Sequence, residues 1–239
     1  MNNTNNPSEK IIIALDGMDK YDVFNLLEKI PDVTWVKVGL ELFVSEGPDI
    51  LSILRDKGKK TFLDLKFHDI PTTVARACFA ASQTGAELIS LHTCAGMKAL
   101  KMAKGAADEG AAKANLRPPK LLGITILTSW TQESFISDLL IDQSIDQRVK
   151  HLADIASNSG LGGCVCSPRE VKFLREIYAD PFELVTPGIR PLGSEINDQC
   201  RVSDASEALK MGASKLVIGR AITQSNDPAF MFRSFCDKV

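Results

Sequence analysis

The sequence is poor in aromatic side chains, in net charge and in long apolar runs. Aromatic residues make up only 6% of the 239 residues, whereas apolar residues reach 44%. This composition favours a core of Val, Ile, Leu and Ala, and the length suits one sizeable domain. The formal net charge is −2 and no block of like charges occurs, which argues against a nucleic-acid-binding surface.

Sequence signals for export, membrane insertion and metal binding are also missing. Residues 1–10 are polar and Asn-rich, without the basic start and apolar stretch of a signal peptide, and we expect them to be disordered. No apolar run approaches the roughly 20 residues that a membrane-spanning helix needs. The cysteines form no C-x-x-C pair and match no zinc-site spacing; they lie at positions 78, 94, 164, 166, 200 and 236. We therefore expect a cytoplasmic protein with reduced cysteines and with no membrane or nucleic-acid partner.

Short apolar segments recur along the chain, and each is followed by a stretch with helical periodicity. Several segments are nearly continuous in Val, Ile and Leu, as in parallel strands that are covered on both faces. Glycines at 58, 85, 160 and 212 lie shortly before the next segment, where helices commonly end. The eight segments are Ile11–Leu15, Trp35–Val38, Thr61–Leu65, Leu88–Leu91, Leu121–Leu127, Gly162–Cys166, Glu183–Thr186 and Lys215–Ile218.

Eight strand–helix units without a linker predict a closed (β/α)₈ barrel, a TIM barrel, that forms a single domain over residues 11–239. A doubly wound open sheet is the alternative that this alternation leaves open. In a barrel, reactive groups gather at the carboxyl ends of the strands, so the fold also predicts where a site would lie.

Charged residues gather where the third predicted strand ends. Asp64 and Lys66 are two positions apart on this strand, so their side chains should point to the same face. Lys37, on the second predicted strand, and Asp69 could complete an alternating array of two carboxylates and two ammonium groups. A structural ion-pair network is the alternative, since charges in an apolar interior are costly unless they are paired. A lysine between carboxylates should stay protonated, which suits a general acid that protonates a carbanion.

The last predicted strand runs into Gly219 and Arg220, a pair that fits phosphate binding. Glycine lets a phosphate approach backbone N–H groups, and arginine adds charge-assisted hydrogen bonds. A lone Gly-Arg pair is a weak motif, but barrels often hold phosphate between the loops after strands 7 and 8. Its position on the eighth predicted strand therefore favours a phosphate site.

The string DLKFHDIPTT, at 64–73, resembles the D-x-K-x-x-D-I-P-x-T signature of the orotidine 5'-phosphate decarboxylases. Five flanking strings agree with the same family: IALD (13–16), VKVG (36–39), LTS (127–129), TPGIRP (186–191) and IGR (218–220). The resemblance spans nearly the whole chain, which has about the length of the bacterial form. It implies a barrel enzyme without metal or cofactor that converts orotidine 5'-monophosphate to UMP and CO₂, the last step of UMP biosynthesis, as a homodimer with shared active sites.

The resemblance also implies a role for each matching residue. Lys66 would protonate C6 of the pyrimidine after CO₂ leaves, and Asp64 would lie beside the substrate carboxylate. Asp69 and Thr73 would reach into the partner subunit's site. The remaining contacts would be to the ribose from Asp16 and Lys37, to the pyrimidine from Thr128 and Ser129, and to the phosphate from Arg190, Gln199, Gly219 and Arg220.

Two other functions share parts of this pattern. A metal-dependent sugar-phosphate decarboxylase or synthase of the same barrel superfamily would carry a glutamate where this chain has Lys37, and a lysine there replaces a metal ligand with a cation. A non-catalytic phosphate-binding barrel would need Arg220 but would have no use for a charged array. Both are therefore weaker interpretations than the metal-free decarboxylase.

Three further residues draw attention because of their type. His92 ends the fourth predicted strand, and we expect a packing or supporting role for it. His68 lies inside the signature at a position that the motif leaves open, and we expect it to be non-catalytic. Trp35 is expected to lie in the core.

Overall fold

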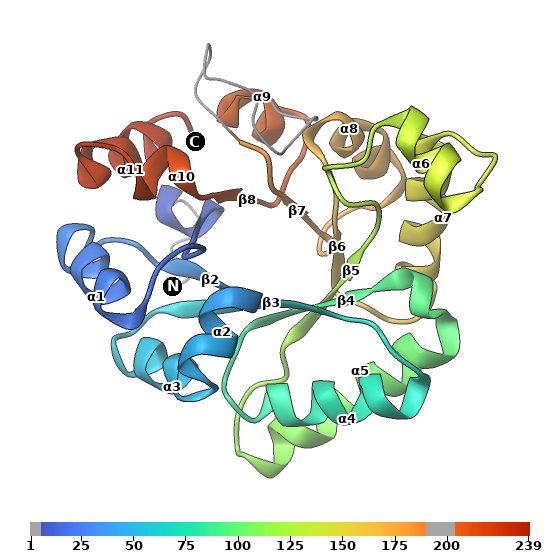
Figure 1. The fold of residues 1–239 in the computed structure, drawn as a ribbon, viewed down its shortest axis with the longest axis horizontal. Helices are drawn as coiled ribbons and strands as arrows, with labels where there is room; N and C mark the ends of the chain where they lie inside the picture. The colour runs from blue at the N-terminus through green and yellow to red at the C-terminus, as the bar shows by residue number, and fades with distance from the viewer. Residues whose placement is uncertain (1–5, 190–203) are drawn as a thin grey trace.

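Eight parallel strands form a closed barrel in the computed structural model, which describes residues 6–189 and 204–239 (Figure 1). Each strand pairs with the next along the chain, and β8 closes the barrel by pairing with β1. This topology confirms the predicted (β/α)₈ barrel and excludes the open sheet. The strands are β1 (Ile11–Ala14), β2 (Trp35–Gly39), β3 (Lys60–Phe67), β4 (Leu88–His92), β5 (Lys120–Ile124), β6 (Gly163–Val165), β7 (Glu183–Thr186) and β8 (Lys215–Ile218).

Helices surround the barrel and cover the outer face of its strands (Figure 1). Their starts follow ordinary capping chemistry: Asp19 accepts hydrogen bonds from the backbone N–H groups of Tyr21 and Asp22, and a capping box begins α7 at Ser144. None of these helices, within the described ranges, is both long and apolar enough to cross a membrane. They are α1 (Lys20–Lys29), α2 (Leu40–Glu46), α3 (Asp49–Asp56), α4 (Pro71–Ser82), α5 (Met97–Lys113), α6 (Gln132–Leu139), α7 (Ile145–Asn158), α8 (Pro168–Ile177), α9 (Ala205–Lys210), α10 (Arg220–Thr223) and α11 (Pro228–Cys236), with short 3₁₀ helices η1 (Pro7–Lys10) and η2 (Thr93–Ala95).

Two apolar cores hold the barrel together. A large one lies between the strands and the helices, and a smaller one fills the barrel itself. Because side chains alternate along a strand, every second residue of each strand points into the barrel. The inner core consists of Ile12, Ala14, Trp35, Phe62, Leu88, Leu122, Val185 and Val217.

The same alternation carries charged residues into the barrel at its carboxyl end. Lys37 follows Trp35 by two positions on β2, and Asp64 follows Phe62 by two positions on β3. Both charged side chains are buried, at 7% exposure each. The apolar inner core thus forms the floor of a charged layer above it.

The amino end of the barrel is closed by the segment before β1. Glu9, in η1, accepts hydrogen bonds from the indole N–H of Trp35 and from the Lys60 ammonium, both at 2.7 Å. The Lys215 ammonium donates to the backbone oxygen of Glu9 at 2.8 Å and lies 4.6 Å from the centre of the Trp35 ring. The prediction that residues 1–10 are disordered was therefore wrong for Pro7–Lys10, because the buried indole N–H and the strand-end lysines bind this segment. Trp35 lies in the core, as predicted.

Candidate active site

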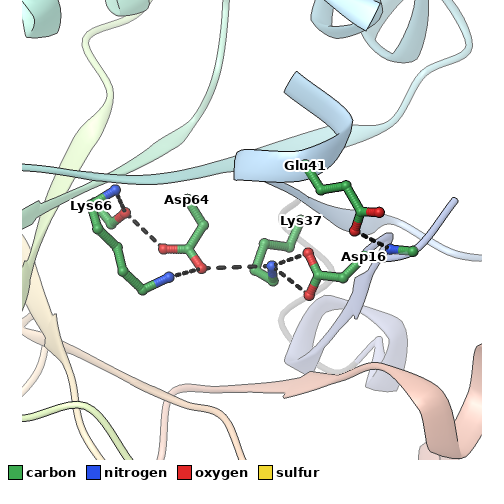
Figure 2. A network of polar contacts seen from close by, with 7 residues as sticks. Asp16, Lys37, Glu41, Asp64 and Lys66 are labelled. Carbon is green, nitrogen blue, oxygen red and sulfur yellow. Dashed lines mark hydrogen bonds and ion pairs between the residues drawn. The ribbon is translucent and has the colours of Figure 1, made fainter. Parts of the chain in front are cut away.

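Four charged side chains form an alternating row across the ends of β1, β2 and β3 (Figure 2). Lys37 Nζ lies 2.8 Å and 2.9 Å from the two carboxylate oxygens of Asp16 and 3.6 Å from Asp64 Oδ2. Lys66 Nζ lies 2.8 Å from the same Asp64 oxygen. Each buried charge therefore has an opposite charge beside it, which makes its burial tolerable.

Asp64 is one of the two buried members of this row, with Lys37. Burial alone raises the pKa of its carboxyl group, but the charges of Lys66 and Lys37, with hydrogen bonds from Lys66 and Ser90, outweigh that effect and hold the pKa below its usual value. The carboxyl group is thus ionised at neutral pH. A fixed negative charge therefore lies at the floor of the site.

Lys66 combines a reachable ammonium group with an unusual backbone. Its side chain is 31% exposed, and its φ of 51° lies in the left-handed region that residues with a Cβ rarely adopt. The β3–β4 register shifts between Leu63 and Phe67, so Lys66 lies within a bulge. The sequence predicted that Asp64 and Lys66 would share a face, but it gave no sign of this bulge.

Gly39, at the end of β2, leaves the space that the Asp16–Lys37 pair occupies. A Cβ at this position would lie 2.4 Å from Asp16 Oδ1 and 3.1 Å from Lys37 Nζ. The loop that carries Asp16 is also fixed from outside, because Glu41 accepts a hydrogen bond from the Gly17 N–H at 3.0 Å (Figure 2). The glycine of the VKVG string is therefore required for steric reasons.

The substitution Gly39→Ala should turn the Asp16 carboxylate away from Lys37, since Asp16 is largely exposed and can rotate while Lys37 cannot. We expect catalytic efficiency to fall at least about tenfold, because a charge-assisted contact of this kind contributes about 1.5–3 kcal/mol. The melting temperature should change little. Gly105→Ala on α5 is the matched control, since a Cβ there meets no atom within 4 Å. Unchanged kcat/KM in Gly39→Ala would contradict this role of the Asp16–Lys37 pair.

A cavity of about 460 Å³ opens above the charged row at the carboxyl ends of the strands, a volume in the range of small-molecule sites. Its two walls differ in chemistry. The charged wall comes from β1 to β3, and the opposite wall is mostly apolar. The apolar wall includes Ile124, Ile126, Val165, Cys166, Ile189 and Val217. The cavity thus suits a ligand with a polar and an apolar edge.

The predicted phosphate end of the site is only partly described. Gly219 and Arg220 line the cavity after β8, and Gly188 lines it after β7, so the loops that follow these two strands do meet there. Arg190 and Gln199, which were predicted to contact phosphate, lie outside the described residues.

The predicted pyrimidine contacts follow β5. Thr128 lines the cavity, half-buried, whereas Ser129 is exposed and is not among the lining residues. The predicted fifth strand, Leu121–Leu127, ends earlier than expected, at Ile124. Ile126 and Leu127 therefore belong to the loop and not to the sheet.

Asp69 and Thr73 lie apart from the charged row of their own chain. Both are exposed, and Asp69 accepts a hydrogen bond from the Ile70 N–H at 2.6 Å but forms no ion pair with any residue in the described part of the chain. Within one chain, the second carboxylate of the array is Asp16 and not Asp69. The prediction that Asp69 serves a partner subunit is compatible with this arrangement and stays a prediction.

His68, directly after β3, and His92, at the end of β4, lie beside each other. Their ring centres are 5.3 Å apart, and neither residue lines the cavity. Burial lowers the pKa of His92 to about 4, and the charges of His68 and Lys66 act in the same direction. His92 is therefore neutral at pH 7, which agrees with the supporting role expected for it.

The residues of the site are poorly suited to hold a metal ion. No group of three or more His, Cys, Asp or Glu side chains within residues 6–189 and 204–239 has the geometry of a metal site. The two carboxylates of the row are instead separated by the Lys37 ammonium. The positive charges in this row are those of Lys37 and Lys66.

Sequence reasoning missed several residues of this region. Ser90 hydrogen-bonds to both Asp64 and Lys66, and Gly39 and Glu41 shape the Asp16 side of the row. Of these residues only Ser90 is noticeable in the sequence, because it is a lone hydroxyl residue within the mostly apolar strand segment LISLH. Gly39 was quoted as part of a motif, but its steric role depends on the tertiary approach of Asp16.

A closed barrel with charged strand ends, and with a glycine and an arginine after β8, is typical of barrel enzymes that bind small phosphorylated molecules. A family model described as orotidine 5'-phosphate decarboxylase / HUMPS matches residues 9–235. The chain belongs to this family.

Curated and solved relatives agree with that assignment. The chain is 83% identical to the orotidine 5'-phosphate decarboxylase of Prochlorococcus marinus (strain NATL1A), with 100% of this chain and 99% of the relative covered. It is 51% identical to the protein of the same name from Parasynechococcus marenigrum (strain WH8102), with 98% and 95% covered. The crystal structure of the orotidine 5'-phosphate decarboxylase from Lactobacillus acidophilus matches with a TM-score of 0.86 at 35% identity and covers 96% of this chain and 98% of that one.

Proposed function

We propose that this protein removes CO₂ from orotidine 5'-monophosphate to give UMP, the last step of UMP biosynthesis, without a metal ion or cofactor. The observation that carries the proposal is the Lys37–Asp64–Lys66 row at the floor of a substrate-sized cavity. The names of relatives that match the whole chain support the substrate.

In this mechanism the substrate carboxylate binds beside the Asp64 carboxylate, which destabilises it. Two unit charges about 4 Å apart repel by about 4 kcal/mol at an effective dielectric constant near 20. Departure of CO₂ removes this repulsion. Contacts to the phosphate, far from the reacting carbon, supply the binding energy that holds the substrate there.

Lys66 then acts on the carbanion. When the bond between C6 and the carboxyl carbon breaks, its electron pair stays on C6, and the Lys66 ammonium 2.8 Å from Asp64 stabilises the developing charge. A proton passes from Lys66 Nζ to C6, which gives UMP. The neutral amine regains its proton from solvent.

The remaining residues would position the substrate. Asp16 and Lys37 hold the ribose hydroxyls, and the loop after β5 contacts the pyrimidine through Thr128 and Ser129. Gly219 and Arg220, with Arg190 and Gln199, hold the phosphate.

Turnover of orotidine 5'-monophosphate by the purified protein tests the proposal. Orotidine and uridine monophosphates differ in ultraviolet absorbance, so turnover is followed directly, and chromatography identifies UMP. A purified protein that leaves orotidine 5'-monophosphate unchanged would contradict the proposal.

The substitution Arg220→Ala should raise KM about 10- to 150-fold and leave the fold intact, because a charge-assisted contact to phosphate contributes about 1.5–3 kcal/mol. Added guanidinium should recover part of the loss. Arg233→Ala is the control, since this arginine is exposed on α11 and does not line the cavity. If Arg220→Ala kept wild-type KM and kcat, the phosphate would have to bind elsewhere.

A two-fold homodimer with shared sites is part of this proposal. The segments after neighbouring strands β2 and β3 expose apolar side chains, with Val44 at 80% and Ile70 at 65% exposure, which suits an interface. Asp69 and Thr73 lie on the same β3–α4 segment and are exposed, so they are available to a second chain.

A cytoplasmic location is supported by the cysteines that the structure describes, all of which are free thiols.

The metal-dependent sugar-phosphate decarboxylase or synthase remains the alternative function. Lys37 argues against it, because its ammonium lies between the two carboxylates that would otherwise bind a cation. The two functions differ in their need for metal: the alternative enzyme requires added Mg²⁺ for activity, whereas the proposed decarboxylase does not.

A further inference from the structure

Ser90 lies in the middle of β4, and its side chain is fully buried. Its hydroxyl donates a hydrogen bond to Asp64 Oδ1 at 2.7 Å and accepts one from the backbone N–H of Lys66 at 3.0 Å. Asp64 and Lys66 form one end of the charged row (Figure 2). Ser90 itself is not among the residues that line the cavity, so it acts on a ligand only through its neighbours.

The position of Ser90 in the sheet explains these two bonds. Leu63 pairs with Ile89, and the next pair joins Phe67 to Leu91. Between these pairs β3 has three residues, 64 to 66, whereas β4 has one, Ser90. The serine therefore lies directly opposite the bulge that carries Asp64 and Lys66.

The bulge leaves the backbone N–H of Lys66 without a hydrogen-bond acceptor in the regular pairing of β3 with β4. Lys66 has a positive φ, and its N–H lies inside the register shift, where the Ser90 hydroxyl takes the place of a backbone carbonyl. An uncommon backbone conformation persists when surrounding contacts fix it. The Ser90 hydroxyl is such a contact.

The hydrogen bond from Ser90 to Asp64 gives the two oxygens of the Asp64 carboxylate different partners. Oδ1 is occupied by the neutral Ser90 hydroxyl, which leaves Oδ2 to face both ammonium groups, at 2.8 Å from Lys66 and 3.6 Å from Lys37. A rotation of the carboxylate would change both distances. One hydroxyl thus fixes the backbone of Lys66 and the side-chain angle of Asp64 together.

We propose that Ser90 is a positioning residue, which holds the β3 bulge so that the Lys66 ammonium and the Asp64 carboxylate meet the substrate in fixed relative positions. The inference rests on the proposed function, since it assigns Lys66 as the proton donor. A misplacement of about 1 Å in a reacting group can lower a rate on the order of a hundredfold.

The test compares Ser90→Ala, which removes both bonds, with Ser90→Thr, which keeps the hydroxyl. Thr125→Val is the matched control. Thr125 directly follows the neighbouring strand β5, and among the described residues its buried hydroxyl bonds only to the Val165 carbonyl, at 2.8 Å. We expect Ser90→Ala to lower kcat on the order of a hundredfold, with KM within about threefold of wild type. Ser90→Thr should recover at least about tenfold of the lost kcat, and Thr125→Val should keep nearly wild-type kcat.

Two results would overturn the inference. The first is a kcat of Ser90→Ala within about threefold of wild type. The second is that Thr125→Val loses as much kcat as Ser90→Ala when both variants lose the same melting temperature. If the wild-type protein itself did not turn over orotidine 5'-monophosphate, the proposed function would fail instead. Amide hydrogen exchange then decides the role of Ser90 separately. Ser90→Ala should speed exchange of the Lys66 N–H at least about tenfold, and unchanged exchange would show that Ser90 does not hold the bulge.

Discussion

Lys66→Ala should lower kcat for decarboxylation at least on the order of a thousandfold, the largest effect expected of any single substitution in this chain. General acid catalysis contributes about 10²–10⁴-fold, and stabilisation of a developing anion contributes about 10²–10³-fold. Under the proposed mechanism Lys66 supplies both, because its ammonium lies against Asp64 at 2.8 Å and is reachable from the cavity. The rate is measured by ultraviolet absorbance.

The variant should still bind UMP, although more weakly. Removal of Lys66 leaves the buried Asp64 carboxylate with Lys37 as its remaining ion-pair partner, at 3.6 Å, so anionic ligands meet a more negative site. Lys104→Ala is the control, since Lys104 pairs with Asp108 on α5, away from the cavity. A Lys66→Ala variant that keeps more than a few per cent of wild-type activity would show that another group protonates C6.

Mixing two inactive variants should restore activity, which is the second large effect. Lys66→Ala and Asp69→Ala are prepared separately, then dissociated, mixed and reassociated. Under random pairing about half of the dimers are mixed, and each mixed dimer has one doubly damaged site and one intact site. Activity should therefore rise from nearly zero to about a quarter of the wild-type value per site.

The physical reason lies in the exposed position of Asp69, which forms no ion pair with the described residues of its own chain. The matched control mixes Lys66→Ala with Asp64→Ala. These two residues are bonded within one chain at 2.8 Å, so every site keeps a lesion and the mixture should stay inactive. If the Asp69 mixture also stayed inactive, Asp69 would serve its own chain and the sites would not be shared in this way.

The barrel could be predicted because each of its strands corresponds to a short apolar segment of the sequence. Seven of the eight predicted segments, from Ile11–Leu15 to Lys215–Ile218, overlap the observed strands to within one or two residues at each end. The exception is β5, which ends at Ile124 although apolar residues continue to Leu127. Apolar character there reflects the wall of the cavity and not strand pairing.

The charged row could be predicted in part. Alternation along β3 placed Asp64 and Lys66 on one face, and a strand-end position placed Lys37 near them. The bulge at Lys66 could not be predicted, because a positive φ at a lysine has no local signature and arises from the register between β3 and β4. The contact between Gly39 and Asp16 is likewise a product of tertiary packing.

The 3₁₀ helix Pro7–Lys10 illustrates the same limit. A polar, Asn-rich sequence reads as disordered when it is judged by composition alone. Glu9 nevertheless binds the Trp35 indole, and its position at the barrel floor comes from residues far along the chain. Polar segments become ordered when the fold offers buried donors that need an acceptor.

Turnover of orotidine 5'-monophosphate by purified protein, before and after exhaustive chelation, tests the central claim most directly. The claim is that the lysines of the charged row, at the carboxyl ends of the strands, supply the positive charge for decarboxylation. We predict that UMP forms at the same rate in both samples. A rate that falls to the background with chelator and returns with Mg²⁺ would contradict the account and favour the metal-dependent alternative.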